Sequence, residues 1–262
     1  MIKSPYLVLN GIAALYLAVT AYILMKRHIR SPLKRVLWGF LMVCAFLAGA
    51  RLLYGILYIE RIVADPMRLF TLQWVNFALY GGLILAGVTW WWLIRRERLS
   101  FFDVTAPLLP HVGIALFLSK MGCFFNGCCY GKATRMPWGM VFERADRTVL
   151  SSIFGASPVL NAITGTKTFL RHPTQLYEAA FGLLAGGIVF WLLKKRVNSG
   201  IAVVVFVVVY TVGRLVSFFF RDFPAASAAS NFVRGPVVYG LVLLGCVVMT
   251  YVIYRANQGI DP

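Results

Sequence analysis

Long apolar runs separated by short polar segments make up most of this 262-residue chain. A membrane-spanning helix needs roughly 20 mainly apolar residues, because the hydrocarbon core is about 30 Å thick. Seven runs reach or approach that length, at 5–25, 36–58, 73–94, 105–122, 174–193, 200–220 and 236–254. The fourth is the weakest, because Pro107, Pro110 and Lys120 interrupt or edge it. The pattern predicts an all-α, polytopic membrane protein with about seven transmembrane helices in a single membrane domain, residues 1–262.

The sizeable polar stretch is the segment of about 123–173, between the fourth and fifth runs. It predicts a small head outside the membrane. The first run begins close to Met1 and lacks a small-residue cleavage site, so we interpret it as a retained span rather than a signal peptide.

Composition agrees with a membrane protein, since 60% of the residues are hydrophobic and only 13% are charged. Soluble domains are about 45–50% apolar and about 25% charged. The net charge of +17 would suggest nucleic acid only if the basic residues shared a soluble face. They lie instead in short clusters between apolar runs, so we expect no nucleic-acid partner and interpret them as topology signals.

The basic clusters alternate along the chain. The loops after the first, third and fifth runs hold five, three and three Lys or Arg residues, whereas the short loops after the second and sixth runs hold two each. Because positive loops stay in the cytoplasm, this count predicts an outside N-terminus, a cytoplasmic C-terminus and an extracytoplasmic head.

Two arginines, Arg51 and Arg214, lie within predicted spans. An arginine at mid-bilayer costs on the order of 3 kcal/mol, so each is a functional hypothesis. Both fall in the outer half of their spans, where they can face one outward cavity and bind a phosphate through paired N–H groups. The alternative is snorkelling to the headgroups, which suits Arg221 better than the deeper Arg214.

The segment HPTQLYE (172–178) opens the fifth span. Pro173 fits the first turn of a helix. Gln175 and Glu178 are three residues apart and share one helix face, so they can point together into the bundle. A glutamate this close to the apolar region needs a cationic partner, either an arginine or Lys120. A structural role at the headgroups is the alternative.

The segment ALYGGLILAG (78–87) places Gly81 and Gly82 in the third span. Small residues let helices approach closely. The competing interpretation is that the paired glycines admit a lipid, with Tyr80 offering its phenol. His111, within the fourth span, is expected to be structural.

The segment KMGCFFNGCCYG (120–131) holds Cys123, Cys128 and Cys129. A zinc site would need a fourth ligand, such as a histidine. A Cys123–Cys128 disulfide suits an oxidising outer face, and a Cys128–Cys129 disulfide would be strained. Packing of small side chains in a glycine-rich turn is the favoured interpretation, and we expect no metal.

Taken in order, the segments GARLLYG, YGGLILAG, KMGCFFNGCCYG, HPTQLYE and YTVGRLVSFFFR resemble the bacterial prolipoprotein diacylglyceryl transferase family, over about residues 45–222. The resemblance implies a seven-span plasma-membrane enzyme. Such an enzyme moves diacylglycerol from phosphatidylglycerol, or a similar anionic phospholipid, to the lipobox cysteine thiol in a prolipoprotein signal peptide. No cofactor is implied, and we expect a monomer.

The resemblance is carried by specific residues. The matching positions are Asn126, Gly127, Gly131, His172, Pro173, Gln175, Leu176, Tyr177, Glu178 and Arg214. The chain departs from the family pattern where Tyr80 replaces a histidine, Lys120 replaces an arginine, and Ser217 replaces a glutamate. Cys123 and Cys128 stand where the family has an asparagine and a glutamate.

The residue patterns and the resemblance together give a set of hypotheses about the site. The expected catalytic residues are Arg214, Lys120, Tyr80 and His172. The expected substrate-binding residues are Arg51, Gly81, Gly82, Asn126, Gly127, Gly131, Gln175, Tyr177 and Glu178. Three alternatives stay open: a transferase of the same fold with another acceptor, a thiol-redox membrane protein that uses the cysteines, and a non-catalytic lipid-binding relative or transporter.

Overall fold

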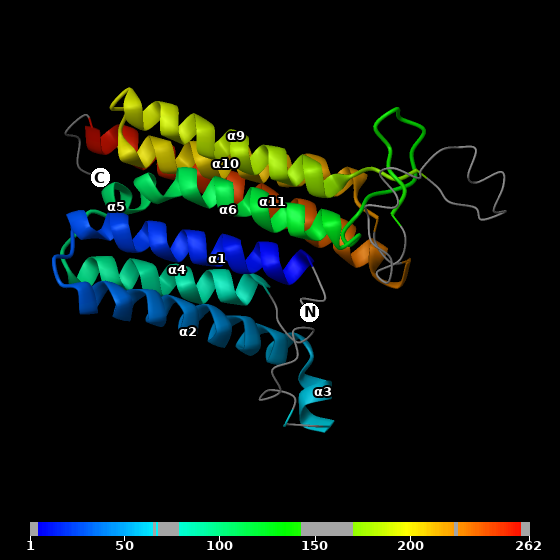
Figure 1. Ribbon diagram of the computed structural model, residues 1–262, viewed down its shortest axis with the longest axis horizontal. Helices are drawn as coiled ribbons and strands as arrows, with labels where there is room; N and C mark the ends of the chain where they lie inside the picture. The colour runs from blue at the N-terminus through cyan, green and yellow to red at the C-terminus, as the bar shows by residue number, and fades with distance from the viewer. Residues whose placement is uncertain (1–4, 65–66, 68–78, 143–169, 223–224, 258–262) are drawn as a thin grey trace. The chain divides into compact units, whose positions relative to one another are not determined.

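The computed structural model describes residues 5–64, 67, 79–142, 170–222 and 225–257 (Figure 1). Helices form nearly all of the regular structure in these residues, and β-pairing there is limited to isolated bridges. The α-helices are α1 (Pro5–Leu24), α2 (Pro32–Leu57), α3 (Ile59–Ala64), α4 (Leu79–Arg96), α5 (Phe101–Thr105), α6 (Leu109–Phe125), α9 (Thr174–Lys194), α10 (Ser199–Phe220) and α11 (Ala225–Asn257). The predicted all-α class is confirmed.

Six helical segments of the described chain are long and apolar enough to cross a membrane. They are Pro5–Arg27, Pro32–Leu57, Phe101–Phe125, Thr174–Lys194, Ser199–Phe220 and Gly235–Arg255. Each overlaps one predicted span. The remaining predicted span, 73–94, overlaps α4, and its first six residues lie outside the described part of the chain, as does 143–169 of the expected head. The protein is therefore a multi-pass helical membrane protein, and the count of seven stays a prediction.

Local sequence explains several helix boundaries. Asn198 caps α10, because its side-chain Oδ1 accepts a hydrogen bond of 2.8 Å from the backbone N–H of Gly200. Pro32 occupies the first turn of α2, where a missing N–H costs nothing. The segment Phe101–Phe125 continues through Pro107 and Pro110 for the same reason, since each proline sits in the first turn of a helical piece.

The chain divides into two compact units, and each is described by itself. The first comprises Met1–Leu17 with Thr105–Pro262, and the second comprises Ala18–Val104. In the first unit α9 packs against α6 and α10, and α10 packs against α11 (Figure 1). A Cβ atom at Gly113 of α6 would lie 3.0 Å from the Cα atom of Gly186 in α9, so only small residues allow this approach.

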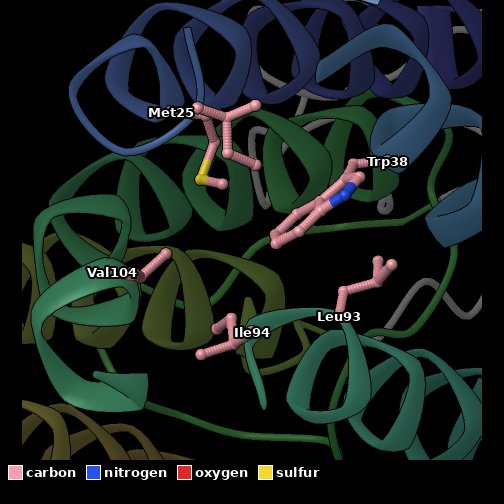
Figure 2. Close-up of a cluster of buried hydrophobic side chains, with 6 residues drawn as sticks. Met25, Trp38, Leu93, Ile94 and Val104 are labelled. Atoms are coloured by element: carbon pink, nitrogen blue, oxygen red, sulfur yellow. The ribbon is translucent and has the colours of Figure 1, made fainter. Parts of the chain in front are cut away.

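In the second unit α2 packs along α4 through a similar contact, because a Cβ atom on Gly81 would collide with the backbone of Gly49. An apolar cluster lies at one end of this pair. Its buried members are Met25, Ile29, Trp38, Leu93, Ile94 and Val104, and Figure 2 shows the labelled side chains gathered between the helices. The single membrane domain expected for residues 1–262 stays a prediction.

Candidate active site

A buried glutamate forms the centre of the candidate site. Glu178 lies in the second turn of α9, and its side chain is 4% exposed. Its Oε2 atom forms ion pairs with Lys120 Nζ from α6 and with Arg214 Nη1 from α10. Arg221, the residue that ends α10, places Nη1 3.6 Å from Oε1. We call these four residues the Glu178 cluster, and its geometry confirms the cationic partner predicted for Glu178.

The cluster forms where three helix ends meet in the first unit. Lys120 is in the second-to-last turn of α6, Arg214 and Arg221 are at the C-terminal end of α10, and Glu178 is near the start of α9. The partial charge of a helix is positive at its N-terminus and negative at its C-terminus, so each charged group lies at the favourable end. Snorkelling is not the arrangement of Arg221, because its guanidinium turns to a buried carboxylate.

The cluster carries more positive than negative charge. Three cations surround one carboxylate, which leaves a surplus of two positive charges. The side chains of Lys120, Arg214 and Arg221 remain 18%, 20% and 25% exposed, so each cation is still accessible to a second anionic group besides Glu178. Unpaired charge is costly where it is partly buried, so the cluster is suited to an anionic group with several oxygen atoms.

The loop after α6 is hydrogen-bonded to α9, the helix that carries Glu178. Gly127 adopts a φ of 63°, and the loop turns there immediately after Asn126 has ended α6. Thr174 Oγ1 then donates a hydrogen bond of 2.7 Å to the carbonyl oxygen of Cys129, and Gln175 Nε2 donates one of 2.6 Å to that of Cys128. Both donors are buried. These contacts hold the loop beside the first turn of α9.

Gly131 joins this loop to two other parts of the site. Its backbone N–H donates a hydrogen bond of 2.8 Å to the carbonyl oxygen of His172. A Cβ atom at this position would collide with the carbonyl oxygen of Phe220 and would lie 2.8 Å from the Cβ atom of His172. Only glycine fits here, so the residue is needed for packing.

His172 and Tyr177 belong to a second polar group next to the cluster. His172 is 9% exposed, and its Nδ1 atom shares a hydrogen bond of 3.0 Å with the Tyr177 hydroxyl. That hydroxyl also accepts a hydrogen bond of 2.9 Å from Trp138 Nε1. Trp138 is not among the predicted site residues, although an indole in the polar segment TRMPWG is a signal for such a contact.

The three cysteines of the loop also lie together. Their sulfur atoms are all within 4.8 Å of one another, and all three are free thiols. The packing interpretation fits Cys123, which is buried, but not Cys129, which is exposed. Hydrogen bonds from the thiols of Cys123 and Cys128, and the charges of Arg221 and Lys120, lower the pKa of the Cys129 thiol below its ordinary value.

Four predicted site residues belong to the second unit. Arg51 is half-buried in α2, and Tyr80, near the start of α4, is exposed. Gly81 and Gly82 are buried against α2, where a Cβ atom on Gly82 would lie 2.8 Å from the Phe46 ring. This geometry favours the helix-packing interpretation of the glycine pair, and the roles predicted for these four residues at the site stay predictions.

The fold and the cluster define a class: multi-pass helical membrane proteins with a positively charged polar centre at converging helix ends. The family model of the prolipoprotein diacylglyceryl transferases matches residues 6–255, and the chain belongs to this family. It is accordingly a multi-pass protein of the bacterial inner membrane.

Curated relatives bear the name phosphatidylglycerol–prolipoprotein diacylglyceryl transferase. The chain is similar to the one from Clostridium tetani, with 29% identity over 69% of this chain and 66% of the relative. It is also similar to the one from Xanthomonas euvesicatoria, with 30% identity over 82% of this chain and 73% of the relative. The relative from Coxiella burnetii is 33% identical over 66% of this chain and 59% of its own length. The chain thus spans roughly two thirds of the length of these relatives.

Proposed function

We propose that this protein transfers the diacylglyceryl group of phosphatidylglycerol to the lipobox cysteine thiol of a prolipoprotein. Family membership over residues 6–255 and the names of the relatives support the reaction. The structural observation that carries the proposal is the Glu178 cluster, with three cations on one buried carboxylate.

The charge of the cluster fits the chemistry of this transfer. The attacking sulfur forms a bond to the glyceryl carbon, the bond from that carbon to the phosphate oxygen breaks, and the electron pair stays on the oxygen. With a thiolate as the attacking group, the phosphate changes from one negative charge to two as it leaves. The surplus of two positive charges therefore matches the leaving group better than the substrate, which is the condition for catalysis.

Individual side chains have separate roles in this proposal. Arg214 and Arg221 offer planar guanidinium groups that can bind two phosphate oxygens, and Lys120 offers a point charge. His172, hydrogen-bonded to Tyr177, is the candidate acceptor for the thiol proton in the first unit. Tyr80 is the candidate acceptor for the thiol proton in the second unit.

The proposed orientation places the cluster at the outer surface. The cluster lies at the N-terminal end of α9, whereas Lys194, Lys195 and Arg196 lie at the opposite end of that helix. Because clustered positive residues flank membrane helices on the cytoplasmic side, the cluster end faces outward. An outside N-terminus, a cytoplasmic C-terminus and a monomeric state complete the proposal.

The test is transfer by purified protein in vesicles that contain labelled phosphatidylglycerol, with a lipobox peptide as acceptor. We expect label on the peptide cysteine, and a loss of about 100-fold or more for Arg214→Ala and Lys120→Ala, the size seen when one preorganised charge-stabilising group is removed. Lys194→Ala, at the far end of α9, is the matched control and should retain activity. Absence of transfer, under conditions in which an active family member works, would contradict the proposal.

Two variations of the assay address the alternatives. A peptide with serine or lysine in place of the cysteine tests another acceptor. A variant with Cys123, Cys128 and Cys129 all changed to alanine tests the thiol-redox alternative, which requires that activity be lost.

A further inference from the structure

The three loop cysteines make a compact sulfur cluster that the transfer reaction does not use. Their sulfur atoms lie within 4.8 Å of one another. Metal–sulfur bonds of about 2.3 Å place the corners of a three-sulfur site about 4.0 Å apart, so only small side-chain movements are needed to close the cluster around an ion. We infer that Cys123, Cys128 and Cys129 form a binding site for a soft metal ion of low coordination number, of which Cu(I) is the representative.

The backbone explains how adjacent cysteines can act together. Cys129 adopts a φ of 64°, in the left-handed region that a non-glycine residue rarely occupies. Gly127, two residues earlier, has a φ of 63°. The loop therefore turns twice within three residues, and the sulfur atoms of Cys128 and Cys129 come to lie beside that of Cys123 at the end of α6. The hydrogen bonds from Thr174 and Gln175 hold this conformation.

The set of ligands selects the kind of ion. Among the residues that the structure describes, no histidine or carboxylate joins the three sulfur atoms within the same reach. Structural zinc sites almost always have four ligands, whereas soft thiolate ligands suit Cu(I). A site of three thiolates without a nitrogen or oxygen ligand therefore favours Cu(I) over Zn(II).

The surrounding charge is compatible with such a complex. Three thiolates and one Cu(I) carry a net charge of −2, and the positive charges of Arg221 and Lys120 both act on Cys129. Binding forms three copper–sulfur bonds and releases to water the protons of those thiols that are still protonated. No electron is transferred, so the step needs no oxidant or reductant.

The variants follow from the positions of the other cysteines. A background with Cys44→Ser and Cys246→Ala leaves only the three loop thiols, and these are counted with a thiol reagent in denaturant before each titration. The principal variant adds Cys129→Ser, because this exposed side chain can change with little effect on folding. The background protein and the Cys129→Ser variant are compared only as preparations that give a single peak in size-exclusion chromatography in detergent.

The measurement is an anaerobic competition with a coloured Cu(I) chelator, followed by X-ray absorption of the copper complex. We expect one Cu(I) per chain, bound by three sulfur atoms, at least tenfold weaker binding after Cys129→Ser, and Zn(II) held more weakly than Cu(I). The inference is overturned if a background protein with three free thiols does not retain Cu(I), if Cys129→Ser binds it equally well, if only two sulfur atoms surround the copper, or if Zn(II) binds more tightly. No lipid or peptide substrate is present, so this result is independent of the proposed transfer.

Discussion

Replacement of Glu178 by glutamine tests the charge balance of the site directly. The amide has nearly the same size as the carboxylate but leaves Lys120, Arg214 and Arg221 around a neutral side chain. Removing one partner of a buried ion pair costs about 3–5 kcal/mol. Because the cations keep 18–25% of their exposure, which weakens their repulsion, we expect the lower end of that range. For a chain of this size, about 3 kcal/mol corresponds to a decrease of roughly 6–12 °C in Tm.

The assay compares thermal unfolding of the wild type and Glu178→Gln in nanodiscs of neutral lipid and in nanodiscs that contain phosphatidylglycerol. A ligand that binds only the folded state stabilises it, by about 2.7 kcal/mol at one hundred times its Kd. The variant has one more uncompensated positive charge than the wild type, so we expect its loss of stability to be smaller in the anionic lipid.

The matched control is Asp222→Asn, which makes the same chemical change in an exposed ion pair. Asp222 pairs with Arg171 at 2.5 Å, and its side chain is 44% exposed. Exposed pairs contribute about 0–1 kcal/mol, so the control should lose little stability in either lipid. The reasoning is refuted if Glu178→Gln is no more destabilising than the control in neutral lipid, or if its loss is the same in both lipids.

Three further substitutions have defined outcomes. Arg214→Lys keeps the charge but loses the planar guanidinium, so we expect about a 10- to 100-fold loss of kcat in the transfer assay, with no change for Arg255→Lys at the end of α11. Gly131→Ala should lower Tm, because its Cβ atom would lie 2.8 Å from that of His172, whereas Gly187→Ala, with nothing within 4 Å, should be neutral or slightly stabilising in the same unfolding measurement. Tyr177→Phe removes the hydroxyl shared by Trp138 and His172, so it should destabilise the protein by about 1–3 kcal/mol. It should also lower transfer if His172 accepts the thiol proton, and unchanged activity would remove His172 from that role.

The sequence predicted two helices of the first unit closely, because their apolar runs end at clear polar signals. The predicted spans 174–193 and 200–220 differ by a residue or less at each end from α9 and α10. The last helix was predicted at 236–254 but extends over Ala225–Asn257, because small residues such as alanine favour helices without being apolar enough to mark a span. Apolar length locates the part of a helix that lies in lipid, and it does not locate the ends of the helix.

The candidate site was predicted residue by residue, but its connections were not. The spacing of Gln175 and Glu178 correctly placed both side chains in the interior, because residues three apart share a helix face. The number of cations on Glu178 depends on how α6, α9 and α10 pack, and that depends on glycines such as Gly113 and Gly186. A pattern within one helix carries no information about such contacts, so Arg221 was interpreted as a headgroup residue.

Ser217 affects the charge balance of the Glu178 cluster. The resemblance implies a glutamate at this position, one helical turn after Arg214, and Ser217 is completely buried. A carboxylate here would share a helix face with Arg214 and would reduce the surplus of the cluster from two positive charges to one. The serine leaves both charges available, which increases the attraction of the site for a phosphate that leaves with two negative charges. Lys120, in place of the arginine that the resemblance implies, keeps the charge unchanged, so of these two departures only Ser217 alters the surplus of the cluster.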